Sequence, residues 1–319
     1  MNIRNKISLL TLLVLVGASA YSAAGDPATQ KLYQKIDSLF VIASSGEVKY
    51  RDMVEPATEA IVNIGVPAVP TLIDKLNTKS ARDRMTIINI LTKIGSPAVP
   101  KLVEALGRPD WLVVQRVCWA LGDIKDSGAV ESLKQVAHHP NWQVREYSVR
   151  ALGLIGIARG LPTVINAFND SLGPVRKAAA YAASGIKKSE VIPKLVGALG
   201  DDFYGARFAA MDALLLLDTA EVIMHLKDAI QSATGLKANL ICQTLGKIGQ
   251  GEAMDILNEQ LDSDKMEQRT YAAVALVSAD PNDICGFYDR IHKKVIDRLS
   301  LVQIESARKA AQNVSQASH

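Results

Sequence analysis

One pattern of apolar and polar positions returns along most of the chain. An apolar pair is followed by a small residue, a variable residue, an apolar residue that is usually Ile, and a turn residue. Copies of it read AIVNIG, ILTKIG, ALGDIK, ALGLIG and TLGKIG. The turn residues stand at positions 65, 95, 125, 156, 187, 218, 249 and 280, always 30 or 31 residues apart. A self-similar period of this length indicates a repeat architecture.

Each repeat unit has the pattern of two helices. In the fourth unit, apolar positions from Val144 to Ile155 form one stripe of a 3.6-residue period, and Gly156 follows as a left-handed cap. A second apolar run extends from Leu161 to Phe168, with Pro162 in its first turn, where a missing N–H has no cost. Three further prolines take the same place in other units, namely Pro70, Pro100 and Pro193.

A single helix pair cannot bury its own apolar stripes, whereas stacked neighbours bury them in one continuous core. The sequence therefore predicts an all-α, right-handed α-solenoid of about eight stacked helix-turn-helix repeats. We expect an N-terminal capping helix at 26–49, the repeat array at 50–285, C-terminal capping helices at 286–312 and a disordered tail at 313–319.

The repeats resemble HEAT repeats, specifically the short variety first described in phycobilin lyases. The family pattern is an Asp or Asn near the start of the first helix, a Val-Arg pair, and then Ala-Ala-x-Ala-Leu-Gly with an Ile. Here the pattern is carried by Asn141, Val144-Arg145 and Ala151-Leu152-Gly153, and by Asp170, Val175-Arg176 and Ala178–Ala180. The resemblance covers roughly residues 50–300 and implies a solenoid that binds other proteins.

The N-terminus has the layout of a secretory signal peptide. Arg4 and Lys6 precede an uncharged apolar run over residues 7–16, and small residues follow over 17–20. The run is shorter than the ~20 residues that a membrane span requires. We expect cleavage after Ala20, or after Ala24 as the second choice, and a bacterial protein that is exported to the periplasm or secreted without a membrane span. The alternative is a buried N-terminal helix.

The balance of charge bears on the class of partner. Removal of residues 1–20 leaves 34 basic and 33 acidic side chains, and opposite signs alternate along the second helices. A nucleic-acid groove requires a basic stripe. The sequence therefore predicts a protein partner and no nucleic acid, and it leaves the partner's identity and the oligomeric state open.

An arginine stands eleven positions before the turn residue in five units. These residues are Arg84, Arg145, Arg176, Arg207 and Arg269. Because a guanidinium can hold two hydrogen bonds in one plane, we interpret the column as a structural ladder that links each arginine to an acid or carbonyl at a neighbouring helix start. Asp170 and Asp202 come shortly before two of these arginines. The alternative is a basic ligand-binding stripe.

An aromatic residue stands fourteen positions before the turn in three units, at Trp111, Trp142 and Tyr204. Only 5% of the residues are aromatic, so their recurrence in one column favours a common role. One interpretation is packing on the preceding unit. The other is a row of exposed anchors for a protein partner, since Trp and Tyr are enriched in interface hot spots.

Glycines and cysteines also recur in columns. Gly122, Gly153 and Gly246 lie inside the first helices, where glycine costs about 1 kcal/mol relative to Ala, and we expect close approach of a neighbouring helix there. Cys118 and Cys242 share a column but lie four units apart, too far for a disulfide. We expect both to be buried and inert, and Cys285 is left unpaired.

No motif indicates catalysis, a metal or a cofactor. His138 and His139 precede Pro140, but adjacent histidines seldom chelate one ion, and no zinc, phosphate-loop or nucleophile motif accompanies them. We therefore expect an exported, non-catalytic scaffold or adaptor that binds a protein. The alternative is an accessory protein of a chromophore-attachment, cofactor-attachment or protein-modification system, as the lyase resemblance implies.

Overall fold

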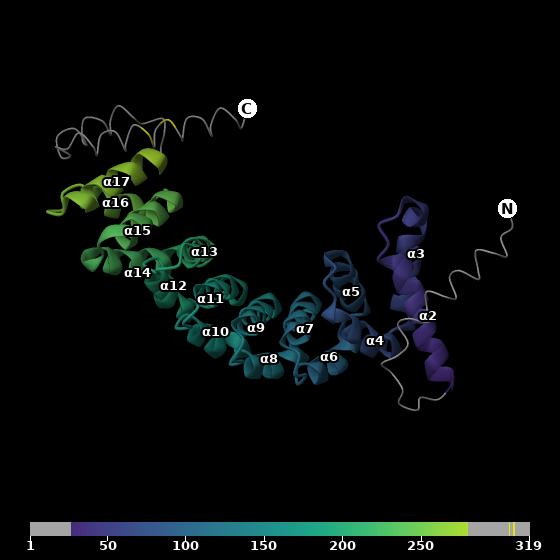
Figure 1. The fold of residues 1–319 in the computed structure, drawn as a ribbon. Coiled ribbons are helices and arrows are strands. Elements are labelled where there is room, and N and C mark those ends of the chain that lie inside the picture. Colours follow the sequence, from purple (N-terminus) through teal and green to yellow (C-terminus); the bar gives the residue numbers. More distant parts are fainter. Residues whose placement is uncertain (1–26, 280–305, 307–308, 310–319) are drawn as a thin grey trace.

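The computed structural model describes residues 27–279, 306 and 309, and within them every regular element is helical (Figure 1). The first helices of the units are α3 (Val54–Ile64), α5 (Ala81–Ile94), α7 (Trp111–Ile124), α9 (Trp142–Ile155), α11 (Gly173–Ile186), α13 (Tyr204–Leu214), α15 (Gly235–Ile248) and α17 (Met266–Ala279). The second helices are α4 (Val69–Asp74), α6 (Val99–Ala105), α8 (Val130–Val136), α10 (Leu161–Ala167), α12 (Ile192–Ala198), α14 (Thr219–Ser232) and α16 (Glu252–Gln260). The predicted all-α repeat fold is confirmed.

Short 3₁₀ helices join the two helices of most units. They are η3 (Val66–Ala68), η5 (Ser96–Ala98), η6 (Ser127–Ala129), η7 (Ala158–Gly160) and η8 (Ser189–Val191), while η2 (Val48–Met53) precedes α3 and η4 (Lys75–Asn77) follows α4. Prolines 70, 100, 162 and 193 lie in the first turn of their second helices, as their sequence position predicts. The missing proline N–H groups therefore leave no backbone hydrogen bond broken.

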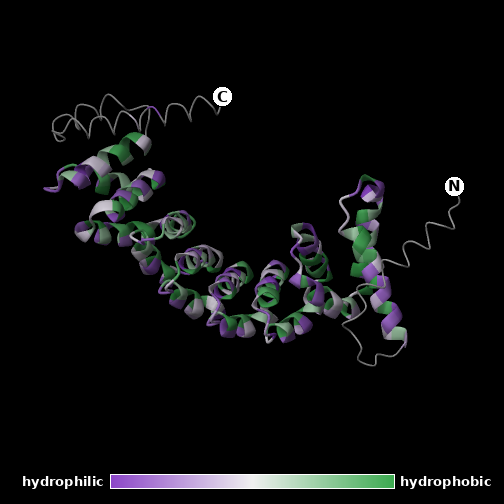
Figure 2. Ribbon diagram, viewed as in Figure 1, coloured by the Kyte–Doolittle hydropathy of each residue, from purple (hydrophilic) through white to green (hydrophobic). Residues whose placement is uncertain are grey.

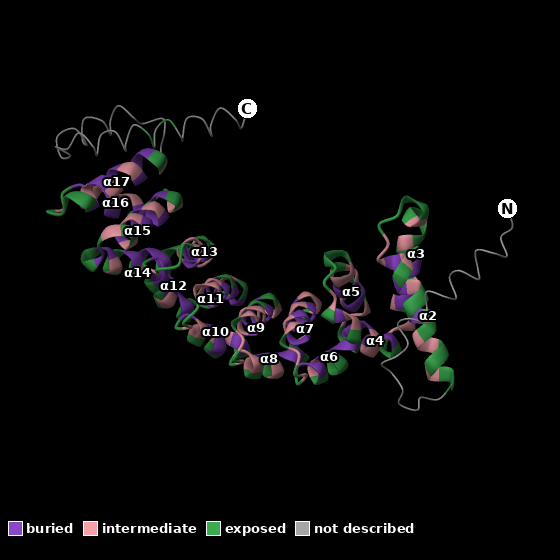
Figure 3. Cartoon of the chain, viewed as in Figure 1, coloured by how far each residue is buried: buried purple, intermediate pink, exposed green. Residues whose placement is uncertain are grey.

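The units stack into a curved arc (Figure 1). The first helices lie on the inner side of the arc and the second helices on the outer side. Apolar residues of both sets fill the space between them, so that one buried core runs from Ile36 in α2 to Val277 in α17 (Figures 2 and 3). No unit has a core of its own, which is the property that makes a solenoid depend on stacking.

The first helices end where the repeat pattern predicts, with one exception. Gly65, Gly95, Lys125, Gly156, Lys187 and Gly249 have positive φ angles and follow directly after their helices. In the sixth unit α13 ends at Leu214, three residues before the expected position, and Asp218 keeps a φ of −60°. The Asp218 side chain instead accepts a hydrogen bond from the Glu221 N–H, so it caps the start of α14.

The glycines inside the first helices mark close helix contacts, as predicted. A Cβ atom on Gly153 would lie 2.3 Å from the Cα atom of Ala182 in α11, and one on Gly122 would lie 3.0 Å from the Cα of Ala151 in α9. On Gly246 it would lie 2.9 Å from the carbonyl oxygen of Ala275 in α17. The absence of a side chain thus allows neighbouring first helices to pack backbone against backbone.

The array begins with α2 (Pro27–Ala43), which lies inside the range expected for a capping helix. Ile36 and Phe40 of α2 are buried and belong to the common core. Among the described residues no single helix is long and apolar enough to cross a membrane, although the bent pair Val48–Ile64 and Val66–Asn77 has suitable length and composition. The predicted signal peptide at 1–20, the tail at 313–319, Cys285 and all of 286–312 except Ser306 and Lys309 lie outside the described residues.

Candidate protein-binding surface

Each first helix presents one exposed stripe, which we call the inner stripe. It comprises the positions 14, 10, 6 and 2 before the turn residue of the unit. In the eight units these positions are exposed or half-buried except at Thr270 (Figure 3). Charges on the stripe balance within the described units, with basic residues Arg51, Lys93, Arg150, Lys177 and Lys247 against acidic residues Glu55, Glu59, Asp123, Glu146 and Asp212.

The predicted aromatic column lies at the outermost position of this stripe, where the first helices begin. Trp111 and Trp142 are the first residues of the neighbouring helices α7 and α9, and Tyr204 is the first residue of α13. Their exposed fractions are 37%, 36% and 65%. All three therefore retain solvent contact in a molecule that buries most other large apolar side chains.

The unit between α9 and α13 has glycine at this position, and a neighbouring residue fills the space. A Cβ atom on Gly173 would lie 2.3 Å from Cγ of Phe203, so the phenyl ring of Phe203 lies over the start of α11. Phe203 is itself 37% exposed. Aromatic side chains thus lie at four successive helix starts, and two of them, Phe203 and Tyr204, come from the unit of α13. We call this set the aromatic edge: Trp111, Trp142, Phe203 and Tyr204.

Tyr204 is held in place by its own helix. Its ring centroid lies 4.5 Å from that of Phe208, and the Arg207 guanidinium lies 5.8 Å from the Tyr204 ring. Beyond the aromatic edge, exposed apolar side chains continue at the next two helix starts, with Leu236 in α15 and Met266 in α17. The edge is therefore the aromatic part of a longer apolar line.

The arginine column makes one contact repeatedly. In four of the five units, Nη1 donates to the carbonyl oxygens six and five residues earlier, in the loop that precedes the same helix. Arg145 contacts His139 and Pro140, Arg176 contacts Asp170 and Ser171, Arg207 contacts Asp201 and Asp202, and Arg269 contacts Ser263 and Asp264, all at 2.7–3.2 Å. These bonds tie each loop to the helix that follows it.

Two of the arginines also bridge to the next unit. Arg145 donates from Nε and Nη2 to the two carboxylate oxygens of Asp170 at 2.7 and 2.9 Å, and Arg176 makes the same bidentate pair with Asp201 at 2.7 and 2.8 Å. Asp202 is a further partner of Arg176. Each acid thus pairs with the arginine of the preceding unit rather than with the arginine that follows it in sequence.

The surroundings of the two aspartates in these pairs lower the pKa values of their carboxyl groups. Burial alone would raise the pKa of Asp170, but hydrogen bonds from Arg145 and from the Leu172 N–H outweigh it and lower that pKa. The pKa of Asp201 is lowered in the same way, with Arg176 and the Phe203 N–H as donors. Since both carboxylates also accept a hydrogen bond from the residue directly before the following helix, the pairs couple the loops of consecutive units.

Two buried side chains outside the arginine column also donate to backbone carbonyl groups of earlier units. Arg116, two positions after Val114, is buried and donates to the carbonyl oxygens of Leu76 and Thr78, which lie between α4 and α5. Gln268 in α17 is also buried and donates to the carbonyl oxygens of Ile230 and Ala233. Neither was identified from the sequence, because each lies outside the column that the repeat defines.

A second aromatic group lies further along the inner stripe. The rings of Trp119 in α7 and Tyr147 in α9 are 6.0 Å apart, and the Arg150 guanidinium lies 5.2 Å from the Tyr147 ring. In α11 the Lys177 ammonium lies 5.6 Å from the ring of Tyr181. Trp119, Arg150 and Tyr181 each stand six positions before the turn residue, but Tyr147 stands nine before it, so the column does not reveal the contact between Trp119 and Tyr147.

Two carboxylates lie beside this second aromatic group. Burial raises the pKa of Glu146, against the opposing effect of Arg150 and Lys177. Burial likewise raises the pKa of Asp123, although a hydrogen bond from Trp119 lowers it in part.

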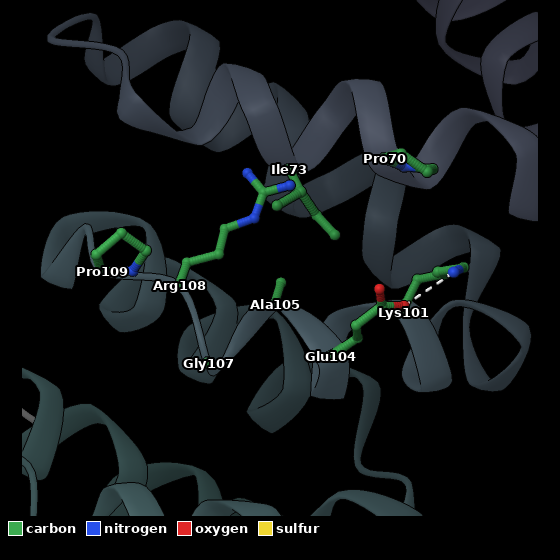
Figure 4. Close-up of a pocket in the computed structure, with 8 residues that line it drawn as sticks. All are labelled: Pro70, Ile73, Lys101, Glu104, Ala105, Gly107, Arg108 and Pro109. Carbon is green, nitrogen blue, oxygen red and sulfur yellow. Dashed lines mark hydrogen bonds and ion pairs between the residues drawn. The ribbon is translucent and has the colours of Figure 1, made fainter.

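The outer side of the arc carries shallow grooves between units. The groove between α4 and α6 is lined by Arg108, Lys101 and Glu104 among others (Figure 4). Arg108 pairs with Asp74 at 2.7 Å, and Lys101 pairs with Glu104 at 2.8 Å. Both cations of this groove are thus paired within the chain in exposed ion pairs.

Within the described residues, no arrangement of side chains is suited to metal binding or to thiol chemistry. No group of three His, Cys, Asp or Glu side chains lies together there in a way that could hold a metal ion. Cys118 and Cys242 are buried and free, as predicted, and burial raises the pKa of both thiols. A raised pKa keeps them protonated and unreactive.

Comparison with known proteins supports the repeat assignment. The family model of HEAT repeats matches residues 69–139 and 130–215. No curated protein matches the chain. Similar solved structures include human deoxyhypusine hydroxylase in complex with glycerol (18% identity over 81% of this chain and 99% of that one, TM-score 0.35), the CpcE–CpcF complex of phycocyanin lyase from Nostoc (16%, 76% and 94%, 0.40) and YibA of Escherichia coli (16%, 91% and 99%, 0.46). These likenesses carry no information on activity or partner.

Proposed function

We propose that this chain is an exported, non-catalytic scaffold or adaptor that binds another protein on the inner side of its solenoid. The observation that carries the proposal is the aromatic edge, where exposed aromatic side chains from three units lie at the starts of α7, α9, α11 and α13. Trp and Tyr combine a large apolar surface with a polar group, and they lose little conformational entropy when a partner covers them.

The charge of the inner stripe supports a protein partner. Acidic and basic residues alternate along it and cancel, so the stripe lacks the single-sign field that a phosphate backbone requires. Aromatic rings with flanking charges of both signs are the composition of the core and rim of protein interfaces. The proposal of export rests on the residue pattern at 1–20 alone.

The test compares binding and stability in one variant. The mature chain captures its partner from a periplasmic fraction, the partner is identified and purified, and its affinity is measured for the native chain and for Trp142→Ala. If the aromatic edge is an interface, Trp142→Ala weakens binding by about 2 kcal/mol or more and leaves the melting temperature nearly unchanged.

A matched control is Met224→Ala, because Met224 is 52% exposed on α14 at the outer side of the arc. It is expected to change neither quantity. The proposal is contradicted if Trp142→Ala costs about 3–5 kcal/mol of stability and affects binding only through unfolding, since that result shows a packing role.

A further inference from the structure

The arginine column lacks one acidic partner, between the units of α13 and α15. Arg145 and Arg176 each bind, through Nε and Nη2, the aspartate that stands 25 residues later in the chain. The residue at the same distance after Arg207 is Ser232, at the end of α14. Within the described residues, Nε and Nη2 of Arg207 have no hydrogen-bond partner, and neither atom is buried.

The Arg207 guanidinium is nevertheless held by the contacts that the paired arginines make. Its Nη1 donates to the carbonyl oxygens of Asp201 and Asp202 at 2.7 and 3.2 Å. Arg145 and Arg176 bind their own loops in the same way. The edge formed by Nε and Nη2 of Arg207 is therefore left open with two donors that match the two oxygens of a carboxylate.

The loop before α13 shows what a complete pair adds to the carboxylate. The Asp201 carboxylate accepts a hydrogen bond from the N–H of Phe203, two residues later, at 2.7 Å, and Asp170 accepts one from Leu172 at 2.9 Å. The Phe203 ring lies over Gly173, the first residue of the helix whose arginine binds Asp201. A segment of the form Asp-x-apolar thus fills the edge of an arginine and covers the start of that arginine's own helix.

Both parts of such a segment are missing one unit later. Ser232 takes the place of Asp201, and Thr234 takes the place of Phe203. The helix start that an apolar side chain would cover there is Tyr204, which is 65% exposed. The open arginine edge and the uncovered ring belong to the same helix, and the guanidinium lies 5.8 Å from the ring. One segment can therefore contact both.

The charges around the start of α13 favour an acidic segment. The Lys177 stem lies beside the second residue of α13, and the Lys237 stem lies beside the loop that precedes this helix. The two aspartates of that loop are both bound by Arg176. Together with Arg207, the two lysines leave an excess of positive charge, which attracts a carboxylate.

We propose that Arg207 and Tyr204 bind an Asp-x-apolar segment of the partner protein. The Asp carboxylate accepts from both open donors of Arg207, and the apolar side chain two residues later covers Tyr204 as Phe203 covers Gly173. The partner thus supplies the pair that the chain lacks between α13 and α15. This inference rests on the proposed function as a protein-binding scaffold, and it names the chemistry of the part of the partner that contacts α13.

The experiment titrates the mature chain with a capped synthetic peptide. The probe is Gly-Asp-Ser-Phe-Gly, acetylated and amidated so that its Asp side chain carries the only carboxylate. Magnetic resonance signals of the arginine Nε–H groups are recorded, and the Arg207 signal is assigned by its loss in Arg207→Lys. The peptide is expected to shift the Arg207 signal and to leave those of Arg145 and Arg176 in place, because their Nε atoms are already paired.

Three control ligands test the chemistry of the segment on the native chain. The peptide with Asn in place of Asp is expected to bind at least tenfold more weakly, because a neutral amide cannot accept a charge-assisted bond on both atoms. The peptide with Ala in place of Phe is expected to bind at least threefold more weakly, and acetate at least tenfold more weakly. The inference is overturned if the Asn peptide or acetate binds as tightly as the probe, if the Ala peptide does so, or if the Arg207 signal does not move.

Two variants test the arginine edge. Arg207→Lys keeps the charge but loses the bidentate geometry, and it is expected to weaken the probe at least tenfold. The matched control is Arg159→Lys in η7, where the arginine is exposed, and it is expected to change nothing. Melting temperatures show whether both variants are folded, and the comparison of the Asp and Asn peptides does not depend on either variant. Equal binding of the probe to Arg207→Lys and to the native chain would overturn the inference.

The two proposals can fail separately. If capture of the protein partner depends on Trp142 but the probe does not bind at Arg207, the Asp-x-apolar site is wrong and the scaffold function stands. If the probe binds with the expected dependence on its carboxylate but partner capture does not depend on Trp142, the site stands and the aromatic edge is not the interface.

Discussion

At the scale of single residues, the arginine column shows how one side chain can serve both a helix and a loop. Arg145 and Arg176 each bind two carbonyl oxygens of the loop before their helix and a carboxylate of the next unit in bidentate fashion, and Arg176 also binds Asp202. Because a guanidinium is planar and has five N–H donors, it can satisfy both partners at once, and lysine cannot reproduce this geometry. If the column is structural, the molecule loses stability when the carboxylates that pair with these arginines are protonated at low pH.

The Asp170 carboxylate is expected to contribute stability that depends on pH. Its pKa in the folded chain is lowered from the ordinary value of 3.8, so the contribution is complete above pH ~4 and is lost as the pH falls through the lowered pKa. Asp170→Asn leaves Arg145 without its carboxylate and is expected to reduce the free energy of unfolding by about 2–3 kcal/mol at neutral pH.

Urea unfolding at a series of pH values measures this effect. The difference between the native chain and Asp170→Asn is expected to shrink as the pH falls below ~4 and through the lowered pKa of Asp170, because the protonated aspartate then lacks a charge just as asparagine does. A difference that stays constant down to pH 2, or the absence of any difference at pH 7, would contradict a stabilising pair between Arg145 and Asp170.

Single residues also show which contacts the sequence does not predict. The columns of Trp111, Trp142 and Tyr204 and of the arginines are visible because they recur at a fixed distance from the turn. Phe203 lies one position outside the aromatic column, and its place over Gly173 depends on how α13 stacks on α11. Trp119 and Tyr147 meet across two units from different repeat positions. Contacts of this kind depend on three-dimensional packing, which a one-dimensional period does not encode.

At the scale of the helices, boundaries follow local backbone chemistry. The period predicts the ends of α3, α5, α7, α9, α11 and α15 because a residue with positive φ stops each helix there. It fails at α13, where Leu217 and Asp218 replace the usual Ile and Gly and Asp218 caps the next helix instead. The number and order of helices within residues 27–279 were therefore predictable, and the end of α13 was not.

The contact between α9 and α11 gives a prediction at this scale. Gly153→Ala places a methyl group against the backbone of Ala182, which cannot move aside as a flexible side chain would. We expect a loss of about 1–3 kcal/mol in the free energy of unfolding, despite the better helix propensity of Ala. Chemical denaturation of the variant measures this loss.

The matched control is Gly197→Ala in α12, where nothing lies within 4 Å of the added Cβ. There the helix propensity of Ala acts alone, and we expect a gain of up to about 1 kcal/mol. An equal gain of stability in both variants would contradict the close contact between Gly153 in α9 and Ala182 in α11.

At the scale of the whole molecule, the curved array places first helices from distant parts of the sequence side by side along its inner side (Figure 1). Trp111 and Tyr204 are 93 residues apart in the chain, yet they belong to one line because the intervening units repeat the same geometry. A solenoid thus turns a sequence period into an extended binding surface without a conventional pocket.

Export is a prediction about the complete chain. Residues 1–26 fused to a reporter that is active only outside the cytoplasm are expected to give activity, and the mature N-terminus is expected at Tyr21 or Gly25. Activity that disappears when Arg4 and Lys6 are both replaced by Glu would support a signal peptide. A full-length product that stays in the cytoplasm would contradict it.

The most direct test of the account is hydroxyl-radical footprinting of the mature chain with and without its purified protein partner, read out residue by residue by mass spectrometry. Binding along the inner side predicts that oxidation of Trp111, Trp142 and Tyr204 falls at least severalfold in the complex, while oxidation of the exposed Met224 on the outer side stays the same. Protection of Met224 together with unchanged oxidation of the three aromatic residues would contradict the proposed binding surface.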